Sequence, residues 1–349
     1  WRHWSAHAAD HAGGKGHGAE LLPYLPADTR IPDGSIWHHC AVVSALEATR
    51  AGIGGPPEPA FLIFQVGPVQ EFIAQARSTR DLWSGSYLLS WLTMHAIKAV
   101  ADRCGPDTII FPSLKGQPIY DFLEGRLDLR PCEDEVLVPG IPNRFLALVP
   151  ASFDAVEVER AFQQEWQLIA KECRAWLIQE SRKNGDSLNF APPYDALFDQ
   201  QVGNHWQITW QLWPWQDAEK ALAAFKVLPL GADNPIHLAQ TIAHRIPNEH
   251  KDERCYRDEQ GKPSKSGRLD PGWAWSAHYQ LCQHALDARR SLRDFRSIPA
   301  PLDSGGRPRK PGHRDALSGR EEAVVQADVL DKLKSPRSEE RRVGKEGRS

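Results

Sequence analysis

The strongest hydrophobic pattern in the chain begins at residue 61. Residues 61–66 are apolar except for Gln65, as in a strand that is buried on both faces. Gly67 and Pro68 end this run, and proline fits the first turn of a helix because its missing N–H has no helical partner there. Apolar residues then recur at helical spacing: Val69, Phe72, Ile73 and Ala76. The pattern therefore predicts a strand that leads directly into an amphipathic helix.

Further elements follow the same logic. A bend at Asp81–Gly85 separates the first helix from a second, predicted for Ser86 to about Asp102. The remaining predicted elements are strands at 108–111 and 143–149, a helix capped by Ser152 or Asp154 and ending near Arg182, and a strand at 205–212. The order is βαββαβ, which is typical of the ferredoxin-like α+β fold. We expect one antiparallel sheet from about residue 60 to 215, with helices on one face.

The long helix and the last strand carry complementary apolar faces. The predicted buried stripe of the helix consists of Val158, Phe162, Trp166, Ile169, Cys173 and Trp176. In the strand, one face consists of Trp206, Ile208, Trp210 and Leu212, and the alternate residues are polar, as in a strand with one face in water. We expect Trp206 and Trp210 to lie on the same face and to pack on Phe162 and Trp166.

The chain becomes polar after about residue 230. One further helix is predicted there, with a buried face formed by Trp275, Tyr279, Cys282, Leu286, Leu292 and Phe295. The six cysteines are far apart, without a CxxC pair, and none follows Cys282. This spacing argues against a zinc site or a disulfide framework and favours a reducing cytoplasm.

Charge and hydropathy exclude two classes of protein. A formal net charge of −3 argues against wrapping of nucleic acid by bulk electrostatics, although a local basic patch remains possible. No signal peptide is visible, and the longest apolar helix contains His95 and Lys98, which a membrane span would exclude. We expect a cytoplasmic protein without membrane contact.

Three motifs in the same order resemble a known family. They are LPADTRIPDGSIWHH at 25–39, GPVQEFIAQARSTRDLWSGSYLLSWL at 67–92 and IPNRF at 141–145. Together they are similar to the large, palm-domain subunit of the type III-B CRISPR effector, the Cmr complex. The resemblance covers about residues 22–145 and continues more loosely to about 324. It implies partners, namely the other Cmr subunits, the CRISPR guide RNA and the target RNA.

The resemblance also implies two enzymatic activities, which the residues do not support for this chain alone. In the family the 25–39 motif closes an HD-type nuclease domain, and His39 matches the family histidine, with Asp33 as a second candidate metal ligand. The chain contains no His-Asp dipeptide, and Trp37 and His39 can equally serve to pack a helix. The family's second palm synthesises cyclic oligoadenylate with a GGDD turn, whereas Gly305-Gly306 is followed here by Arg307. We therefore expect neither DNA cleavage nor oligoadenylate synthesis.

The strand-to-helix junction is the candidate binding site. Its polar residues are Gly67, Gln70, Arg77, Arg80, Ser84 and Ser86, and helix N-termini and glycine suit the close approach of anionic groups. In the family the equivalent stretch lines an ATP pocket between two palms, with Mg or Mn as the metal. Two alternatives stay open: Arg77, Arg80 and Asp81 form only surface ion pairs, or the segment docks a neighbouring subunit or guide RNA.

The sequence divides into four parts. Residues 1–52 are expected to be a helical remnant of an HD-type domain, and the Gly/Pro-rich stretch 51–59 forms a boundary. Residues 60–230 are expected to form the first palm with a helical insertion, and residues 231–334 a helical and loop region leading towards a second palm. Residues 335–349 have no apolar periodicity and resemble a non-native tail.

Overall fold

The structure is a computed structural model of the whole chain. It describes residues 4–11, 19–28, 31–50, 54–125, 136–183, 194–215, 256–257, 263–264 and 275–292, together with residues 307, 322 and 324. The chain forms two compact units, neither of which is continuous in sequence. Unit 1 consists of residues 1–66, 87–159 and 208–293, and unit 2 of residues 67–86, 160–207 and 294–349.

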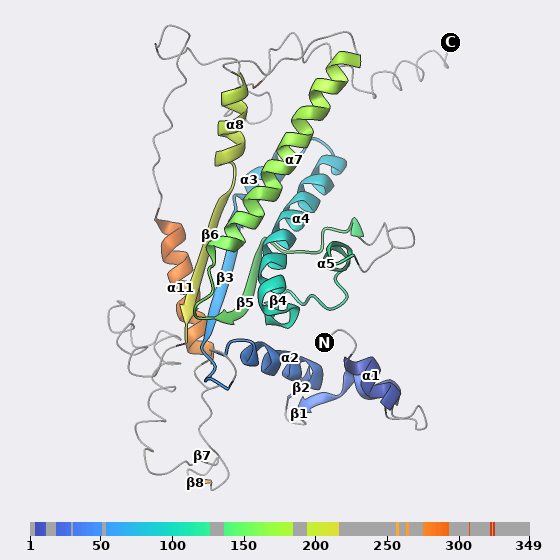
Figure 1. The fold of residues 1–349 in the computed structure, drawn as a ribbon, viewed down its shortest axis with the longest axis vertical. Helices are drawn as coiled ribbons and strands as arrows, with labels where there is room; N and C mark the ends of the chain where they lie inside the picture. The colour runs from blue at the N-terminus through green and yellow to red at the C-terminus, as the bar shows by residue number, and fades with distance from the viewer. Residues whose placement is uncertain are drawn as a thin grey trace. The chain divides into compact units, whose positions relative to one another are not determined.

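A four-stranded antiparallel sheet is the main framework of the chain (Figure 1). Its strands are β3 (Pro59–Gly67), β4 (Ile109–Phe111), β5 (Arg144–Pro150) and β6 (Gln207–Pro214), in the order β4-β5-β3-β6. Strand β5 pairs antiparallel with both β3 and β4. The predicted α+β class and antiparallel sheet are confirmed, and β6 begins two residues later than predicted.

Strand β3 is the most deeply buried element. Residues 60–64 are all buried, and only Gln65 interrupts the apolar run, as the sequence predicts. Phe64 stacks on Phe145 of the neighbouring strand, with their ring centroids 5.1 Å apart. Both residues belong to the largest fully buried side chains, so their burial is a main source of hydrophobic stabilisation.

The predicted bend between the two helices is wrong. Helix α3 (Val69–Ala74) is short, and helix α4 (Thr79–Cys104) starts seven residues before the predicted Ser86. Ser78 Oγ accepts a hydrogen bond from Asp81 N–H at 3.2 Å, and Asp81 Oδ2 accepts one from Arg77 N–H at 3.2 Å. The Ser78 hydroxyl thus satisfies a free N–H in the first turn of α4, and the Asp81 carboxylate holds the backbone just before the helix, so the helix begins there.

Gly85 lies inside helix α4 for a steric reason. A Cβ atom at this position would lie 3.2 Å from Cε1 of Phe72 in α3. The residue therefore permits the close approach of the two helices and does not mark a bend.

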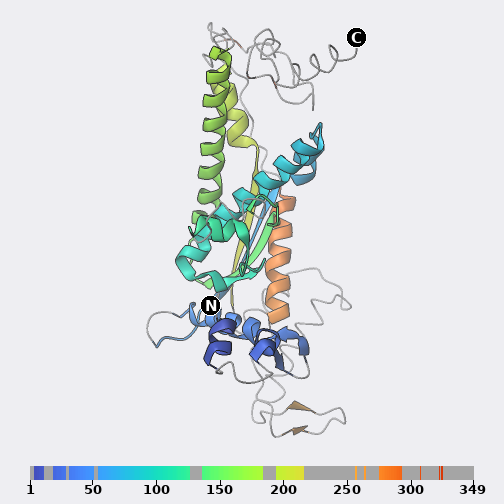
Figure 2. The same ribbon diagram turned by 90° about the vertical axis from the view of Figure 1, so that its right-hand side faces the viewer.

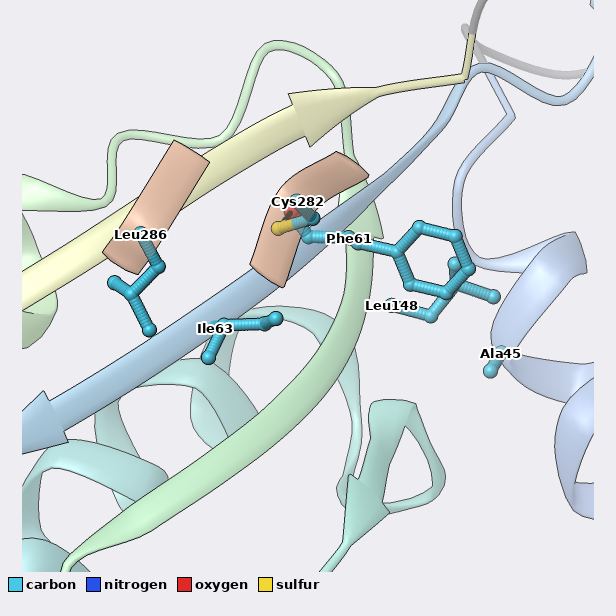
Figure 3. Packing of buried hydrophobic residues seen from close by; sticks show 6 residues of the cluster. All are labelled: Ala45, Phe61, Ile63, Leu148, Cys282 and Leu286. Carbon is cyan, nitrogen blue, oxygen red and sulfur yellow. Dashed lines mark hydrogen bonds between the residues drawn. The ribbon is translucent and has the colours of Figure 1, made fainter. Parts of the chain in front are cut away.

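The sheet is covered on both faces, which corrects the prediction of helices on one face. Helix α11 (Trp275–Ser291) lies on one face, and α4 lies on the other (Figure 2). Phe61, Ile63 and Leu148 of the sheet form a cluster with Cys282 and Leu286 of α11 and with Ala45 (Figure 3). Because alternate residues of β3 are equally apolar, both faces of the strand require a cover.

Helix α11 confirms most of the predicted face but not its end. Cys282 and Leu286 are buried, whereas Leu292 is 67% exposed and Phe295 lies outside the described residues. The thiol of Cys282 donates to the carbonyl oxygens of Phe61 and Gln211 at 3.7 and 3.6 Å. Burial raises the pKa of Cys282 to about 12, so the thiol remains protonated in this core.

Helix α7 (Val156–Lys183) begins as predicted, with Asp154 as its cap. In unit 2, Phe162 and Trp166 pack on Trp206 with ring centroids 6.0 and 5.6 Å apart, which confirms the predicted contact. Trp210 in unit 1 hydrogen-bonds to Glu159 of the same helix, as expected if Trp206 and Trp210 share a face.

The buried stripe predicted for α7 is wrong in its second half, where the predicted residues are exposed. Cys173 is exposed and Trp176 is 59% exposed. Leu177 and Ile178 are partly buried instead, together with Phe198 of helix α8 (Tyr194–Asn204) and Val324. The neighbours of this half of the helix therefore lie on an adjacent face, which periodicity alone does not reveal.

The remaining described elements are short or local. The region predicted to be helical contains α1 (Trp4–His11), the 3-10 helix η1 (Ala19–Tyr24), α2 (Ile36–Glu47) and an unpredicted pair of strands, β1 (Pro26–Asp28) and β2 (Ile31–Ser35). The others are η2 (Pro106–Thr108), α5 (Pro118–Leu123), β7 (Tyr256–Arg257) and β8 (Pro263–Ser264). In the described part of the chain, no helix is both long and apolar enough to cross a bilayer.

Candidate functional site

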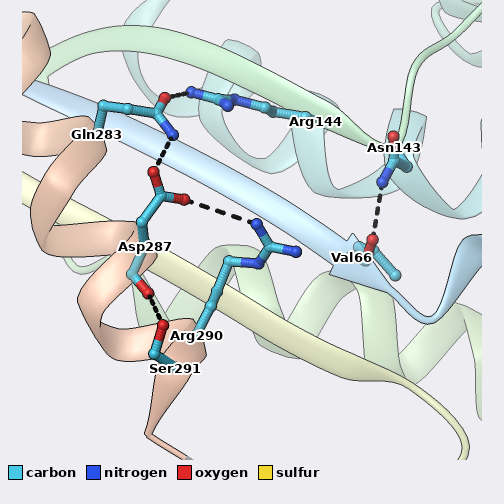
Figure 4. Close-up of polar contacts among 7 residues, drawn as sticks. All are labelled: Val66, Asn143, Arg144, Gln283, Asp287, Arg290 and Ser291. Carbon is cyan, nitrogen blue, oxygen red and sulfur yellow. Dashed lines mark hydrogen bonds and ion pairs between the residues drawn. The ribbon is translucent and has the colours of Figure 1, made fainter.

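Two hydrogen bonds hold the exit from strand β3 to the loop before β5, and two more join the same loop to α4. Asn143 Nδ2–H donates to the carbonyl oxygen of Val66 at 2.8 Å, and Val66 N–H donates to the carbonyl oxygen of Asn143 at 3.0 Å (Figure 4). Ser90 Oγ of α4 donates to the carbonyl oxygen of Ile141 at 3.0 Å and accepts from Ile141 N–H at 3.3 Å. The chain is therefore fixed at Val66, one residue before the candidate binding segment.

The candidate binding segment, residues 67–86, lies wholly in unit 2 and differs sharply from β3. None of its residues is buried. Gln70, Arg77, Arg80 and Ser84 are exposed, and Gly67 and Ser86 are partly exposed. All six predicted residues are therefore at least partly exposed to solvent.

Arg77 and Ser86 already have intramolecular partners. Arg77 Nε lies 3.5 Å from Asp81 Oδ2, and Ser86 Oγ donates to the carbonyl oxygen of Leu82 at 2.9 Å. Burial opposes ionisation of Asp81, but hydrogen bonds from Arg77 N–H and Ser78 together with the charge of Arg77 outweigh it and lower the pKa of Asp81. The alternative that these residues form only surface ion pairs therefore holds for Arg77 and Asp81.

Arg80 differs from Arg77. Within the part of the chain that the structure describes, Arg80 takes part in no ion pair. Its guanidinium, the amide of Gln70 and the hydroxyl of Ser84 provide donors, which suits oxygen atoms of an anionic ligand. Helix α3 has only six residues and contributes little dipole, so these side chains carry more of the argument than the helix N-terminus.

An aromatic cluster supports this segment within unit 2. Phe72 of α3 packs against His205 and Trp206, with ring centroids 5.4 and 4.9 Å apart. Trp166 stacks on His205 at 5.5 Å and donates its indole N–H to the carbonyl oxygen of Val202 at 2.8 Å. The segment that carries the exposed polar residues is therefore packed, through Phe72, against aromatic side chains of unit 2.

The candidate metal ligands from the sequence are His39 and Asp33. His39 is exposed on α2, and the side chain of Asp33 lies outside the described part of the structure. Among the residues described, no group of three or more His, Cys, Asp or Glu side chains could hold a metal ion. The donors of residues 67–86 suit an anionic group, and within the described residues no carboxylate cluster of the kind that Mg or Mn prefers accompanies them.

One polar network was not foreseen from the sequence. Arg144 of β5 donates to Gln283 Oε1, Gln283 Nε2 donates to Asp287 at 3.0 Å, and Asp287 lies 3.6 Å from Arg290 (Figure 4). These residues connect β5 with α11 within unit 1. The IPNRF motif was the only available signal, because Arg144 and Gln283 are 139 residues apart.

The chain was compared with known families and proteins. Residues 61–171 match the family described as CRISPR-associated protein Cmr2, N-terminal. The CRISPR system Cmr subunit Cmr2 of Pyrococcus furiosus is 38% identical over 168 residues, which cover 48% of this chain and 17% of that protein. The CMR subunit Cmr2 of Saccharolobus solfataricus is 34% identical over 97 residues, or 28% of this chain and 9% of that protein.

A solved structure gives an independent comparison of the fold. The structure titled "Type III-B Cmr-beta Cryo-EM structure of the Apo state" aligns with a TM-score of 0.51 and 17% identity, over 90% of this chain and 33% of that chain. At this identity the likeness concerns the fold alone. The chain spans less than a fifth of either curated relative in the matched regions. The family match and both relatives nevertheless agree, and residues 61–171 are similar to the N-terminal part of Cmr2, a subunit of the CRISPR Cmr complex.

Proposed function

We propose that the chain acts as part of an RNA-guided type III-B effector, in which residues 67–86 contribute to binding of a nucleoside triphosphate such as ATP. The observation that carries the proposal is the exposure of Gln70, Arg80 and Ser84 on a segment whose entry is fixed at Val66. A fixed backbone with exposed donors binds an anion with little loss of conformational entropy. Other Cmr subunits, guide RNA and target RNA are the partners that the similarity to Cmr2 favours.

The strand order supports a ferredoxin-like palm as the scaffold of this site. The sheet order is β4-β5-β3-β6. The first strand in the chain, β3, therefore lies between the third, β5, and the fourth, β6, and the second, β4, lies at the edge beside β5. This order and the two crossover helices fit a split βαβ arrangement. The proposal concerns binding alone, because the chain has Arg307-Pro308 after Gly305-Gly306 where the family's synthase has two aspartates.

Titration of the chain with ATP and Mg²⁺ by calorimetry tests the proposal. We expect Gln70→Ala to weaken binding by about two- to tenfold, the range for loss of one hydrogen bond. Ser86→Ala should weaken binding less, because the Ser86 hydroxyl already donates to the carbonyl oxygen of Leu82. Gln75→Ala is the matched control, because Gln75 is also exposed in the same segment but was not assigned to the site. Equal ATP affinities of the wild type and both variants, with the fold intact, would show that residues 67–86 form a packing surface and not a ligand site.

A second function is favoured by a separate observation. Leu82 and Trp83 at the start of α4 are each 42% exposed, next to Arg80. Exposed aromatic and arginine side chains are frequent in contacts with single-stranded RNA and in protein interfaces. Retention of a Cmr subunit or guide RNA by the wild type but not by Trp83→Ala, without any ATP binding by the wild type, would favour docking over nucleotide binding.

A further inference from the structure

The loop at residues 141–143 contacts the chain on both sides of the candidate binding segment. Asn143 contacts Val66, the residue directly before the segment, through two hydrogen bonds. Ile141 contacts Ser90, four residues after its end, through two more. All four of these residues lie in unit 1, and we call them the anchor.

Burial makes the anchor stronger than an exposed set of hydrogen bonds. Val66 is 1% and Ser90 2% exposed, and Ile141 is buried as well. Asn143 is half-buried, so the two hydrogen bonds between Ser90 and Ile141 are the better shielded from water. Loss of a partner leaves a buried polar group of Val66, Ser90 or Ile141 unsatisfied. The side chain of Asn143 must present its nitrogen to Val66, because the carbonyl oxygen of Val66 can only accept.

From this arrangement we infer that Asn143 and Ser90 are positioning residues for residues 67–86. Fixing the residues next to both ends of a segment lowers the conformational entropy that the segment loses when a ligand binds. The carbonyl group of Val66 belongs to the peptide that leads into Gly67, so its hydrogen bond restrains the backbone at the point where the segment begins. Neither Asn143 nor Ser90 contacts the ligand; they act through the backbone. The inference rests on the proposed function for its effect on nucleotide affinity.

The Asn143→Asp variant gives a readout that a general loss of stability does not. Its carboxylate would place negative charge against the carbonyl oxygen of Val66, whereas the protonated carboxyl group can donate a hydrogen bond again. We expect affinity for ATP and Mg²⁺, expressed as a ratio to the wild type at the same pH, to fall about tenfold at pH 8 and to recover at low pH. Ser90→Ala is expected to lower affinity about threefold at both pH values.

Thr108→Val is the matched control. Thr108 is fully buried in unit 1, and its hydroxyl donates to the carbonyl oxygen of Gly105 at 2.6 Å, away from the anchor. Thermal unfolding is measured for all variants, and the control should lose stability without losing affinity. Asn143→Ala replaces Asn143→Asp for the comparison at pH 8 if the latter does not fold. Equal losses of affinity in the control and the anchor variants, or ratios near one in the anchor variants, would overturn the inference.

Amide hydrogen exchange at Val66 separates the anchor from the nucleotide function. The N–H of Val66 donates to Asn143, so its exchange should be about tenfold faster in Asn143→Asp at pH 8 than in the wild type, after correction for intrinsic rates, and unchanged in Thr108→Val. If the wild type binds no ATP, the proposed function fails, and exchange alone decides the anchor. Unchanged exchange at Val66 in the Asn143 variants contradicts the anchor whether or not ATP binds.

Discussion

Strand β3 and the segment that follows it are adjacent in the chain and opposite in character. Residues 60–64 are all buried, whereas no residue from 67 to 86 is buried. The strand is held by apolar packing on both faces, and the segment by hydrogen bonds at its ends and by the aromatic cluster around Phe72. Buried packing and exposed polar groups therefore lie on separate, consecutive stretches of the chain, so we expect substitutions in the strand to change stability and substitutions in the segment to change surface properties.

The largest expected effect is on the strand. Phe64→Ala removes a ring that is fully buried and stacked on Phe145, and we expect the free energy of unfolding to fall by about 3–5 kcal/mol. Urea denaturation measures this change. Leu82→Ala is the control in the exposed segment, with an expected change of about 0.5 kcal/mol or less. Similar losses at the two positions would remove the contrast between strand and segment.

A smaller effect is expected at Trp210. Full burial would predict a loss of about 3–5 kcal/mol for Trp210→Ala. The side chain is only partly buried, and its indole N–H donates to Glu159 at 3.0 Å, so we expect about 2 kcal/mol. Trp210→Phe retains much of the packing and should cost about 1 kcal/mol. A change below about 1 kcal/mol for Trp210→Ala would mean that β6 contributes little to the sheet's stability.

Much of the strand framework was predictable because it depends on local patterns. The apolar run at residues 61–66 and the alternation around Trp206 and Trp210 gave the sheet and the contact with α7. The start of α4 was also encoded, since Ser78 and Asp81 have the spacing of a capping box, but the following Gly85 suggested a bend. The absence of a side chain at Gly85 leaves room for the ring of Phe72. This contact belongs to the tertiary structure, and the sequence does not show it.

The anchor and the second cover of the sheet were not predictable. Ser90 and Ile141 are 51 residues apart, and Asn143 and Val66 are 77 apart, so no periodicity connects them. Helix α11 was predicted as amphipathic, but its placement on Phe61 and Ile63 follows only from the apolar character of both faces of β3. For the candidate site, the sequence identified the donors that the structure shows to be exposed. It did not show that Asp81 pairs with Arg77, nor that Arg80 takes part in no ion pair within the described residues.

Lys98 tests an electrostatic contact inside the framework. Its ammonium lies 2.6 Å from Asp102 and 2.7 Å from Glu124, and so connects α4 with the end of α5. Burial lowers the pKa of Lys98, but the hydrogen bonds and charges of the two carboxylates outweigh burial and raise the pKa above 10.5. We expect Lys98→Met to lower the free energy of unfolding by about 1 kcal/mol at pH 7.

The pH dependence of this contact has a definite sign. Because the pKa of Lys98 is raised in the folded state, its stabilisation is fully present below about pH 10.5 and is lost as the pH rises through the folded pKa. The difference in unfolding free energy between the wild type and Lys98→Met should therefore shrink above pH 10.5. A difference that stays constant from pH 7 to 11.5 would show that the contact is not electrostatic.

The smallest effects on stability are expected in the segment itself. Arg80→Ala should leave the melting temperature unchanged but weaken ATP binding about tenfold, as for loss of a charged hydrogen bond. Arg77→Ala should weaken ATP binding less, because Asp81 already holds the Arg77 guanidinium. Calorimetric titration of both variants measures the difference. An equal or larger loss for Arg77→Ala would contradict the assignment of the two arginines.

Photo-crosslinking with an azido derivative of ATP locates the residues of the chain that lie next to a bound nucleotide. The chain is irradiated with the probe and Mg²⁺, with and without excess ATP, and the labelled peptides are identified by mass spectrometry. We expect ATP-protected labelling within residues 67–86 and none on the buried residues 60–64 of β3. Labelling that excess ATP does not prevent, or ATP-protected labelling confined to other parts of the chain, would contradict the assignment of residues 67–86 as the nucleotide site.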